Sequence, residues 1–134
     1  MIPPQRYFNK PFLQILSTGK TWRKEDIAKE LAKRLNLTKE DLKETTKGGG
    51  ITRFNDRITW VVAYLKKAGL IKVEERGYYQ ITDSGLSLLE ATSSFECIDN
   101  NVLSRASEDF NVFQNKWREK VYKGVRKKSE HLNR

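Results

Sequence analysis

The sequence has few of the residues from which disulfide frameworks, metal centres and membrane anchors are built. It contains one cysteine, Cys97, and one histidine, His131, so we expect no disulfide, no cysteine zinc site and no cysteine–histidine nucleophile. No apolar run approaches the ~18 residues of a membrane span, and the first residues lack a signal-peptide pattern. These absences predict a protein of the reducing cytoplasm with no membrane segment, and no motif indicates a cofactor.

Acidic residues are too few to balance the basic ones. The sequence has 26 Lys/Arg against 17 Asp/Glu, which gives a net charge of +9. Residues 116–134 contain eight basic residues and two glutamates, so this tail carries a net charge of +6 and the rest of the chain only +3. A polyanionic partner is compatible with this distribution, but charge alone does not establish one. The basic residues of the tail are Lys116, Arg118, Lys120, Lys123, Arg126, Lys127, Lys128 and Arg134.

The N-terminal part of the chain predicts an extended arm and a first helix. Pro3 and Pro4 disfavour helix at the start. We expect a helix from Asn9, acting as the N-cap, to Gly19, with Pro11 in its first turn. Its core-facing residues would be Phe12, Ile15 and Leu16.

Two further helices are predicted before a glycine-rich interruption. Residues 21–37 carry an apolar stripe that includes Ile27 and Leu31 on an otherwise charged helix. Thr38 is expected to cap a short helix after it. The glycines of residues 47–50 are interpreted as a flexible joint, because no Walker pattern follows them.

The segment 52–69 gives the clearest helical pattern. One set of residues recurs on the side expected to face the core, and a charged and aromatic set recurs on another side. Gly69 is expected to end the helix. The core set is Phe54, Ile58, Val61, Val62 and Leu65, and the other set is Arg53, Asp56, Arg57, Trp60, Tyr64 and Lys67.

A β-hairpin and a closing helix are predicted next. Residues 70–75 and 78–82 have strand-like composition around a turn at Arg76-Gly77. Thr82 or Asp83 would cap the closing helix, which is expected to return three leucines to the core. These are Leu86, Leu88 and Leu89.

The C-terminal part predicts an amphipathic extension. Ser107 before Glu108 and Asp109 could restart a helix, so residues 102–128 are compatible with one helix or two. The apolar stripe needs a partner, which is the domain's own core, a second copy of the chain in a homodimer, or a downstream domain. The stripe consists of Leu103, Ala106, Phe110, Phe113, Trp117 and Val121.

These elements together predict a winged helix-turn-helix: a mainly α fold with a small β-hairpin, plus a C-terminal helical extension. A helix about as wide as a DNA groove needs supporting helices, and an adjacent ribbon can reach the backbone or minor groove. A two-stranded hairpin is barely stable alone, so it should lie against the helices. We expect residues 1–92 to form the winged-helix DNA-binding domain and residues 93–134 to form a linker and a basic, amphipathic helical extension.

Four stretches resemble the N-terminal domain of Mrr-type restriction proteins. The resemblance implies a DNA-reading domain of a modification-dependent (type IV) restriction system, placed ahead of a separate nuclease domain. That nuclease domain uses strand-borne carboxylates and a lysine, and no such Asp…Glu-x-Lys constellation occurs here. We therefore expect no enzymatic activity from this chain and a downstream nuclease domain as its partner. The stretches are PFLQIL, RFNDRITWVVAYLKKAGLI, RGYYQITDSG and IDNNVLSRASEDFNVF.

The first candidate DNA contacts lie at the start of the 52–69 helix. Arginine can take both acceptors of guanine, and asparagine can pair twice with adenine in the major groove. Arg53, Asn55 and Arg57 are therefore expected to contact bases, with Tyr64 and Lys67 further along the same helix. The alternative is that Arg57 pairs with a nearby acid and that Asn55 only serves the helix start.

Aromatic residues suggest contact with a modified base. A methyl group on adenine or cytosine projects into the major groove, and reading it takes an apolar surface beside a hydrogen-bonding group. Trp60 and Trp22 are the candidates, with Tyr64 and Phe54 as further sources of such a surface. The alternative is that these aromatic residues fill the core.

The remaining candidates are expected to contact the DNA backbone. Thr21, Arg23 and Lys24 would begin the second helix, where backbone N–H groups can meet a phosphate. Arg76 at the hairpin tip would reach phosphate or the minor groove, although Glu74 and Glu75 beside it weaken the basic character of the hairpin.

The sequence thus predicts a DNA-binding domain that selects duplex DNA, unmodified or methylated, for a restriction endonuclease. Two alternatives remain open. One is a stand-alone winged-helix transcriptional regulator, and the other is a winged-helix module for protein interaction or dimerisation.

Overall fold

The computed structural model describes the backbone of residues 1–132 and the side chains of residues 1–120. Within these limits the chain is mainly helical with a small antiparallel sheet, as predicted. In chain order the elements are α1 (Arg6–Leu16), β1 (Trp22–Arg23), α2 (Lys24–Arg34), α3 (Lys39–Lys43), α4 (Arg53–Lys67), β2 (Ile71–Glu75), β3 (Tyr78–Ile81), α5 (Asp83–Ala91), α6 (Asn100–Ala106) and α7 (Glu108–Leu132).

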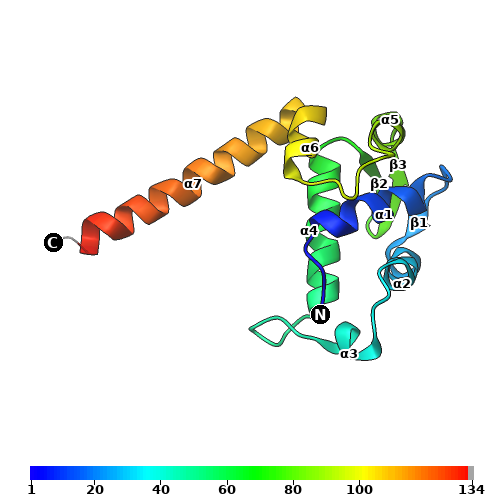
Figure 1. Cartoon of the computed structure of the whole chain (residues 1–134), viewed down its shortest axis with the longest axis horizontal. Helices are drawn as coiled ribbons and strands as arrows, with labels where there is room; N and C mark the ends of the chain where they lie inside the picture. Colours follow the sequence, from blue (N-terminus) through cyan, green and yellow to red (C-terminus); the bar gives the residue numbers. More distant parts are fainter. Residues whose placement is uncertain (133–134) are drawn as a thin grey trace.

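The arrangement places α4 as a column through the body, with α1 crossing it (Figure 1). The sheet and α5 lie on one side of this column, and α2 and α3 lie near its N-terminal end. Helix α7 starts beside the C-terminal end of α4 and projects away from the body (Figure 1). Helices α1, α2 and α4, the hairpin that follows α4 and the closing helix α5 give the winged-helix arrangement predicted from the sequence.

The core forms where α1, α2 and α4 meet the inner face of the sheet. Most of its fully buried side chains come from helical residues spaced three or four apart, because that spacing places them on one face of each helix. Leu70 and Ile98 join the core from outside the helices. The predicted core residues Phe12, Ile27, Leu31, Ile58 and Leu65 are all buried. Only Val62 of the predicted α4 set is half-exposed.

Helix α1 begins earlier than predicted, and Asn9 is not its N-cap. The helix starts at Arg6, and Asn9 lies inside it, fully buried, where its Nδ2 donates a hydrogen bond of 2.8 Å to the Ile98 carbonyl. The earlier start allows Phe8 to join the core, where its ring packs 6.0 Å from that of Phe54. Pro11 consequently lies in the second turn rather than the first.

The sheet has a third strand that the sequence did not predict. Strand β1 pairs antiparallel with β3, with Trp22 opposite Tyr79, so the strand order is β1-β3-β2. Residues 21–23 are therefore not helical, and α2 begins only at Lys24. The Lys24 N–H donates a 2.9 Å hydrogen bond to the carbonyl of Gly77 in the hairpin turn. Long-range pairing of this kind overrides the local helical pattern.

The hairpin and the closing helix follow the predicted boundaries closely. Gly77 turns the chain with φ of 87°, a conformation that favours glycine. Thr82 caps α5, because its Oγ1 accepts a 3.1 Å hydrogen bond from the Gly85 N–H. The prediction that Leu86 reaches the core is wrong: its side chain is 41% exposed. Gly85 is the residue of α5 that faces the sheet, and the helical turn carries Leu86 away from it.

A capped helix and a closed loop separate α2 from α4. Thr38 and Asp41 form a capping box at α3, with the Asp41 N–H donating to Thr38 Oγ1 over 3.1 Å and the Thr38 N–H donating to Asp41 Oδ2 over 2.9 Å. The glycine-rich residues 47–50 form a loop that an isolated bridge between Thr45 and Thr52 closes. The predicted cap at Thr38 is confirmed.

The C-terminal extension consists of two helices with a break at Ser107. Ser107 Oγ accepts a 3.2 Å hydrogen bond from the Phe110 N–H, which starts α7. Leu103 and Phe110 are fully buried, whereas Trp117 is 53% exposed. Of the described stripe, Leu103, Phe110 and Phe113 thus pack on the domain's own core, whereas Ala106 is exposed. Val121, His131 and the basic residues from Lys123 onward lie outside the described side chains.

Among the described residues, no helix combines the length and the apolar character that crossing a membrane requires. In the same part of the chain, no group of three or more His, Cys, Asp or Glu residues is placed to hold a metal ion.

Candidate nucleic-acid interface

Helix α4 presents two surfaces on either side of its buried face. Thr52 caps the helix, its Oγ1 accepting a 3.1 Å hydrogen bond from the Asn55 N–H. We call the first surface the wing flank: the exposed residues Asn55, Thr59, Ala63 and Lys66, on the side of α2 and the hairpin. We call the second surface the extension flank: Arg53, Arg57, Trp60 and Tyr64, on the side where α7 begins.

Two open hollows border the wing flank. Asn55 lines one of them together with Lys24 and Ala28 of α2. The second hollow lies between α4 and Val73 of β2. On α4 it is lined by Thr59, Ala63 and Lys66, and its lining is completed by Val62, Lys67 and Asp109. This side of α4 is therefore bordered by α2 near Asn55, and further along by the hairpin and by Asp109 at the start of α7.

The three residues expected to read bases at the start of α4 have different surroundings. Arg53 Nε lies 3.4 Å from Glu44 Oε1, and its N–H donates to the Glu44 carbonyl. Arg57 is half-buried, with its Nε out of contact with solvent and without a hydrogen bond. Asn55 is exposed, and its side-chain amide makes no hydrogen bond within the described part of the chain. The Asn55 side chain is therefore exposed and unbonded, whereas the side chains of Arg53 and Arg57 are engaged or half-buried.

An aromatic cluster joins the extension flank to α7. The Tyr64 ring lies 5.5 Å from that of Phe110 and 5.9 Å from that of Phe113, in edge-to-face geometry. Lys67 Nζ lies 5.9 Å from the centre of the Phe113 ring. Tyr64 is thereby half-covered by the extension. Trp60 borders the cluster, 6.1 Å from the Tyr64 ring, and remains 48% exposed.

The two tryptophans expected to touch a modified base lie apart. Trp22 is on β1, half-buried, and its Nε1–H donates a 3.2 Å hydrogen bond to Thr18 Oγ1. No contact joins its ring to that of Trp60 among the described residues. Phe54 is buried in the core. Trp60 is therefore the aromatic residue of this set that α4 exposes.

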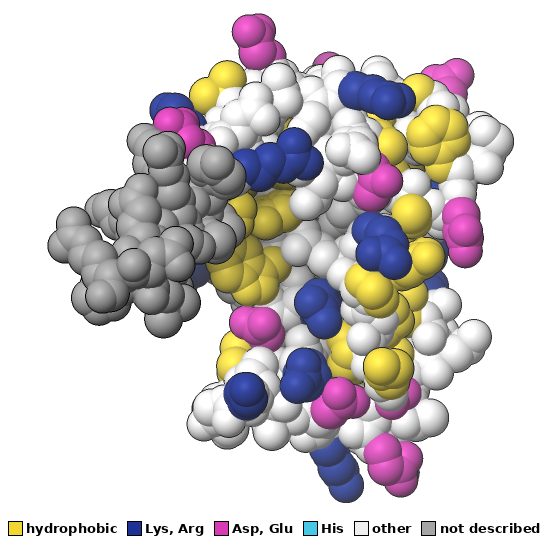
Figure 2. Space-filling model, turned by 60° about the vertical axis from the view of Figure 1, so that its left-hand side comes forward, with side chains coloured by type: hydrophobic (Ala, Val, Ile, Leu, Met, Phe, Trp, Pro, Cys, Tyr) yellow, Lys and Arg dark blue, Asp and Glu magenta, His cyan; other side chains and the backbone are white. Residues whose placement is uncertain are grey.

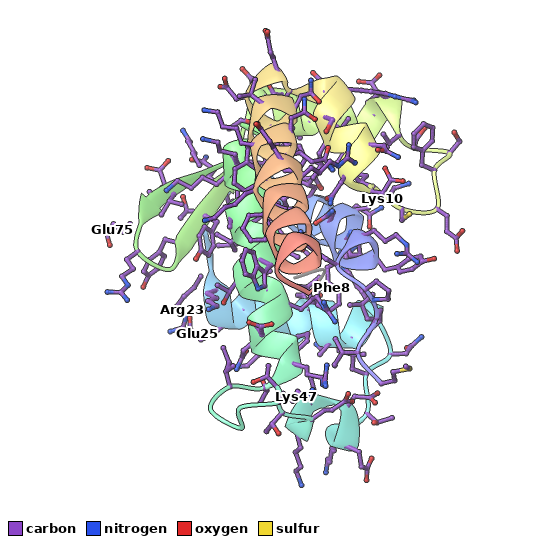
Figure 3. All side chains as sticks on the ribbon, turned by 90° about the vertical axis from the view of Figure 1, so that its left-hand side faces the viewer. Phe8, Lys10, Arg23, Glu25, Lys47 and Glu75 are labelled. Atoms are coloured by element: carbon purple, nitrogen blue, oxygen red, sulfur yellow. The ribbon has the colours of Figure 1, made fainter. Side chains whose placement is uncertain are left out.

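The start of α2 is partly occupied by contacts within the protein. Arg23 Nε lies 3.4 Å from Glu25 Oε2 and 3.7 Å from Asp26 Oδ2, and Figure 3 shows Arg23 beside Glu25. The Lys24 N–H already donates to Gly77, so it is not free for a phosphate. Thr21 is exposed, and the half-exposed Lys24 side chain forms no ion pair within the described residues.

The hairpin carries charges of both signs. Arg76 is exposed at its turn and forms no ion pair within the described part of the chain, whereas Lys72 Nζ lies 3.3 Å from Glu74 Oε1. Figure 3 shows the hairpin with Glu75 standing out to the side of α4. On the face drawn in Figure 2, Lys and Arg are interspersed with Asp and Glu, and hydrophobic side chains gather in two separate areas. This face is mixed in charge rather than uniformly basic.

A family model described as the Mrr N-terminal domain matches residues 6–91. The chain belongs to this family. The match runs from α1 to α5 and so includes α4 and the hairpin. It confirms the resemblance found in the sequence motifs. No curated protein and no solved structure matches the chain.

Within this Mrr N-terminal domain, sequence reasoning missed three residues of the wing flank. Thr59, Ala63 and Lys66 are exposed on α4 but were not named as contacts. A signal for them was present, since Asn55, Thr59 and Ala63 are each four residues apart and therefore share one face of a helix. Thr59 and Ala63 are neutral and so escaped a search for cations and aromatic residues, whereas Lys66 falls outside the charged and aromatic set recognised on α4.

Proposed function

We propose that this Mrr N-terminal domain binds double-stranded DNA, unmodified or methylated, and selects the target of a restriction endonuclease. The observation that carries the proposal is the wing flank, an exposed helix surface held between α2 and the hairpin. A B-form major groove is about as wide as one α-helix. In helix-turn-helix proteins the residues near the start of such a helix contact base edges, and here that position belongs to Asn55.

The basic residues around the wing flank would supply the contacts to phosphate. Lys24, Lys66 and Arg76 are not engaged in ion pairs within the described part of the chain. Each lies on an element that borders the wing flank or on α4 itself. Contacts of this kind set the position of a protein on the duplex and make its affinity depend on salt.

Cleavage is assigned to a separate nuclease domain. The sequence lacks the strand-borne carboxylates and lysine that Mrr-type nuclease domains require, so the present chain is proposed to select DNA and not to cut it. A homodimer would place two wing flanks on one duplex, and the exposed Trp117 of α7 offers an apolar contact for a second copy.

A protein-interaction module is the alternative that one observation favours. Two of the arginines expected to meet DNA, Arg23 and Arg53, are paired with carboxylates of the same chain. The acidic residues Glu74 and Glu75 at the hairpin edge also favour a protein-interaction module over DNA binding. The module would retain the fold without affinity for a duplex.

A binding titration tests the proposal. Matched duplexes that are unmodified, N6-methylated on adenine or C5-methylated on cytosine are titrated at two salt concentrations. We expect binding that weakens as salt rises, and a Lys66→Ala variant that binds every duplex more weakly, since it loses about one phosphate contact. Lys29→Ala, an exposed lysine elsewhere on the surface of α2, is the matched control and should bind as the unchanged protein does. Absence of duplex binding at low salt would reject the proposal and favour the interaction module.

A further inference from the structure

We infer that the wing flank reads A·T base pairs, with Asn55 on adenine and the methyl groups of Thr59 and Ala63 on the thymine methyl. This inference rests on the proposed function and adds the class of base pair that the domain selects. It keeps the expectation that Asn55 pairs with adenine, and sets aside the expectation that Arg53 and Arg57 contact guanine.

Asn55 is free to pair with a base. Its N–H is satisfied by Thr52 Oγ1, so the side-chain amide is not needed to cap the helix. That amide is exposed and makes no hydrogen bond within the described residues. An asparagine amide offers one donor and one acceptor side by side, which matches N7 and N6–H of adenine in the major groove.

Thr59 offers its methyl group rather than its hydroxyl group. Thr59 Oγ1 donates a 3.0 Å hydrogen bond to the carbonyl of Asn55, one turn earlier. This bond uses the hydroxyl hydrogen and holds the side chain in one rotamer. Ala63, one turn further along, is also exposed and carries only a methyl group. Methyl groups of threonine and alanine contact the C5 methyl of thymine, a group that distinguishes A·T from G·C pairs.

The guanine-reading side chains are held away from this row. Arg53 is paired with Glu44, and Arg57 is half-buried; both belong to the extension flank. Arg23, near the other side of the wing flank, is engaged by Glu25 and Asp26. Consequently an amide and two methyl groups make up the uncharged part of the surface that α4 opens toward α2 and the hairpin.

A selection experiment tests the inference. The full chain selects from a duplex library with randomised central positions, and the bound fraction is sequenced. We expect enrichment of A·T pairs by roughly 10- to 100-fold over G·C at the contacted positions, which corresponds to the discrimination of a bidentate contact.

Matched variants assign that enrichment to named atoms. Asn55→Ala should abolish the preference for adenine. Thr59→Ser, which keeps the hydroxyl group and loses the methyl group, should reduce the preference for thymine, whereas Thr59→Val, which keeps the methyl group, should retain it. Asn101→Ala removes an exposed amide on α6 and should leave the selected sequences unchanged. The three positions are exposed sites on helices, and circular dichroism verifies that each of the four variants is folded.

The outcomes separate this inference from the proposed function. Salt-sensitive binding that is indifferent to the central base pairs would overturn the inference and leave the function standing. Enrichment of G·C pairs that disappears in Arg53→Ala or Arg57→Ala would also overturn it, in favour of the arginines. Failure to bind any duplex would overturn both.

Discussion

Gly85 lies where α5 crosses the sheet, and a side chain there has no room. A Cβ at this position would come within 2.3 Å of the Leu70 carbonyl oxygen and 2.6 Å of Ile81 Cγ1. The first of these neighbours is backbone and cannot move without disturbing the link between α4 and the hairpin. We predict that Gly85→Ala lowers the free energy of unfolding by about 1–3 kcal/mol, even though alanine favours helix more than glycine does. Urea denaturation measures this loss.

The matched control is Gly48→Ala in the loop before α4. Nothing lies within 4 Å of a Cβ built at Gly48, and its φ lies outside the left-handed region. Its free energy of unfolding should change by less than about 0.5 kcal/mol. Equal stability of the two variants would contradict the prediction, because it would show that the backbone around Leu70 moves to accommodate a Cβ at position 85.

At the scale of elements, α7 is joined to the body through Phe110. This side chain is fully buried and contacts the rings of Tyr64 and Phe113. We predict that Phe110→Ala lowers the free energy of unfolding by about 3–5 kcal/mol, because it leaves a cavity in the core. Denaturation followed by circular dichroism should give one transition, shifted to lower denaturant.

Val112→Ala on the same helix is the control for Phe110. Val112 is 44% exposed, so its loss should have little effect. A loss below about 1 kcal/mol in Phe110→Ala would contradict the prediction and indicate that α7 is not part of the cooperative unit.

Helix α3 contains a carboxyl group whose titration reports on the N-terminus. The Asp41 carboxylate accepts hydrogen bonds from the Met1 amino group and from the Thr38 N–H, and these lower the pKa of Asp41 from 3.8 to about 2. Because the folded-state pKa is lowered, this stabilisation is present above pH 3.8 and is lost as the pH falls through about 2. Acetylation of the Met1 amino group removes the largest cause, so the pKa of Asp41 should rise toward 3.8.

A titration of the Asp41 carboxyl carbon by NMR, with and without acetylation, measures this change. In Thr38→Gly the Met1 amino group and the N–H that donates to Asp41 are retained and only the smaller contribution of the Thr38 hydroxyl is lost, so the pKa of Asp41 should stay below 3.8. The same low value after acetylation would contradict the assigned role of Met1.

Local signals predicted the elements, and long-range contacts account for the exceptions. Thr38, Thr82, Gly69 and Gly77 mark helix ends and the turn where they were expected, because capping and positive φ depend on neighbouring residues. Strand β1 was missed because its residues become a strand only by pairing with β3, more than fifty positions away.

The candidate site was predictable in part. The sequence predicted that α4 carries an exposed surface and named Asn55 among the candidate contacts, and Asn55 is exposed in the structure. Helical spacing places Asn55 and Arg57 on different faces, but it could not show which of the two faces α7 covers. It also could not foresee that Arg53 pairs with Glu44, a residue that the closed loop brings back to the start of α4.

At the scale of the whole molecule, the charge is divided between a mixed body and a basic tail. We predict that replacing Lys123, Arg126, Lys127 and Lys128 with glutamine weakens binding to all duplexes alike. The slope of log affinity against log salt should fall by about 0.9 for each cation that neutralises a phosphate. Base preference should not change, since phosphate contacts carry no sequence information.

Titrations over a range of salt concentrations measure this slope. Replacing Lys39 and Lys43 of α3 with glutamine is the control for a loss of charge elsewhere in the molecule. An unchanged slope in the tail variant, together with a reduced one in the control, would locate the phosphate contacts on the body.

The hairpin is fastened to the body along the strand that lies in the middle of the sheet. Strand β3 is hydrogen-bonded on both edges, Gly77 accepts from Lys24, and Gln80 Nε2 donates to the Gly19 carbonyl over 2.6 Å. A hairpin held in this way does not swing as a free arm, so the distance between its tip and α4 is fixed before any partner arrives. A bound duplex would then have to adjust its groove width to the fixed distance between the hairpin tip and α4. Sequences that bend or narrow easily would be preferred even at base pairs that no side chain touches.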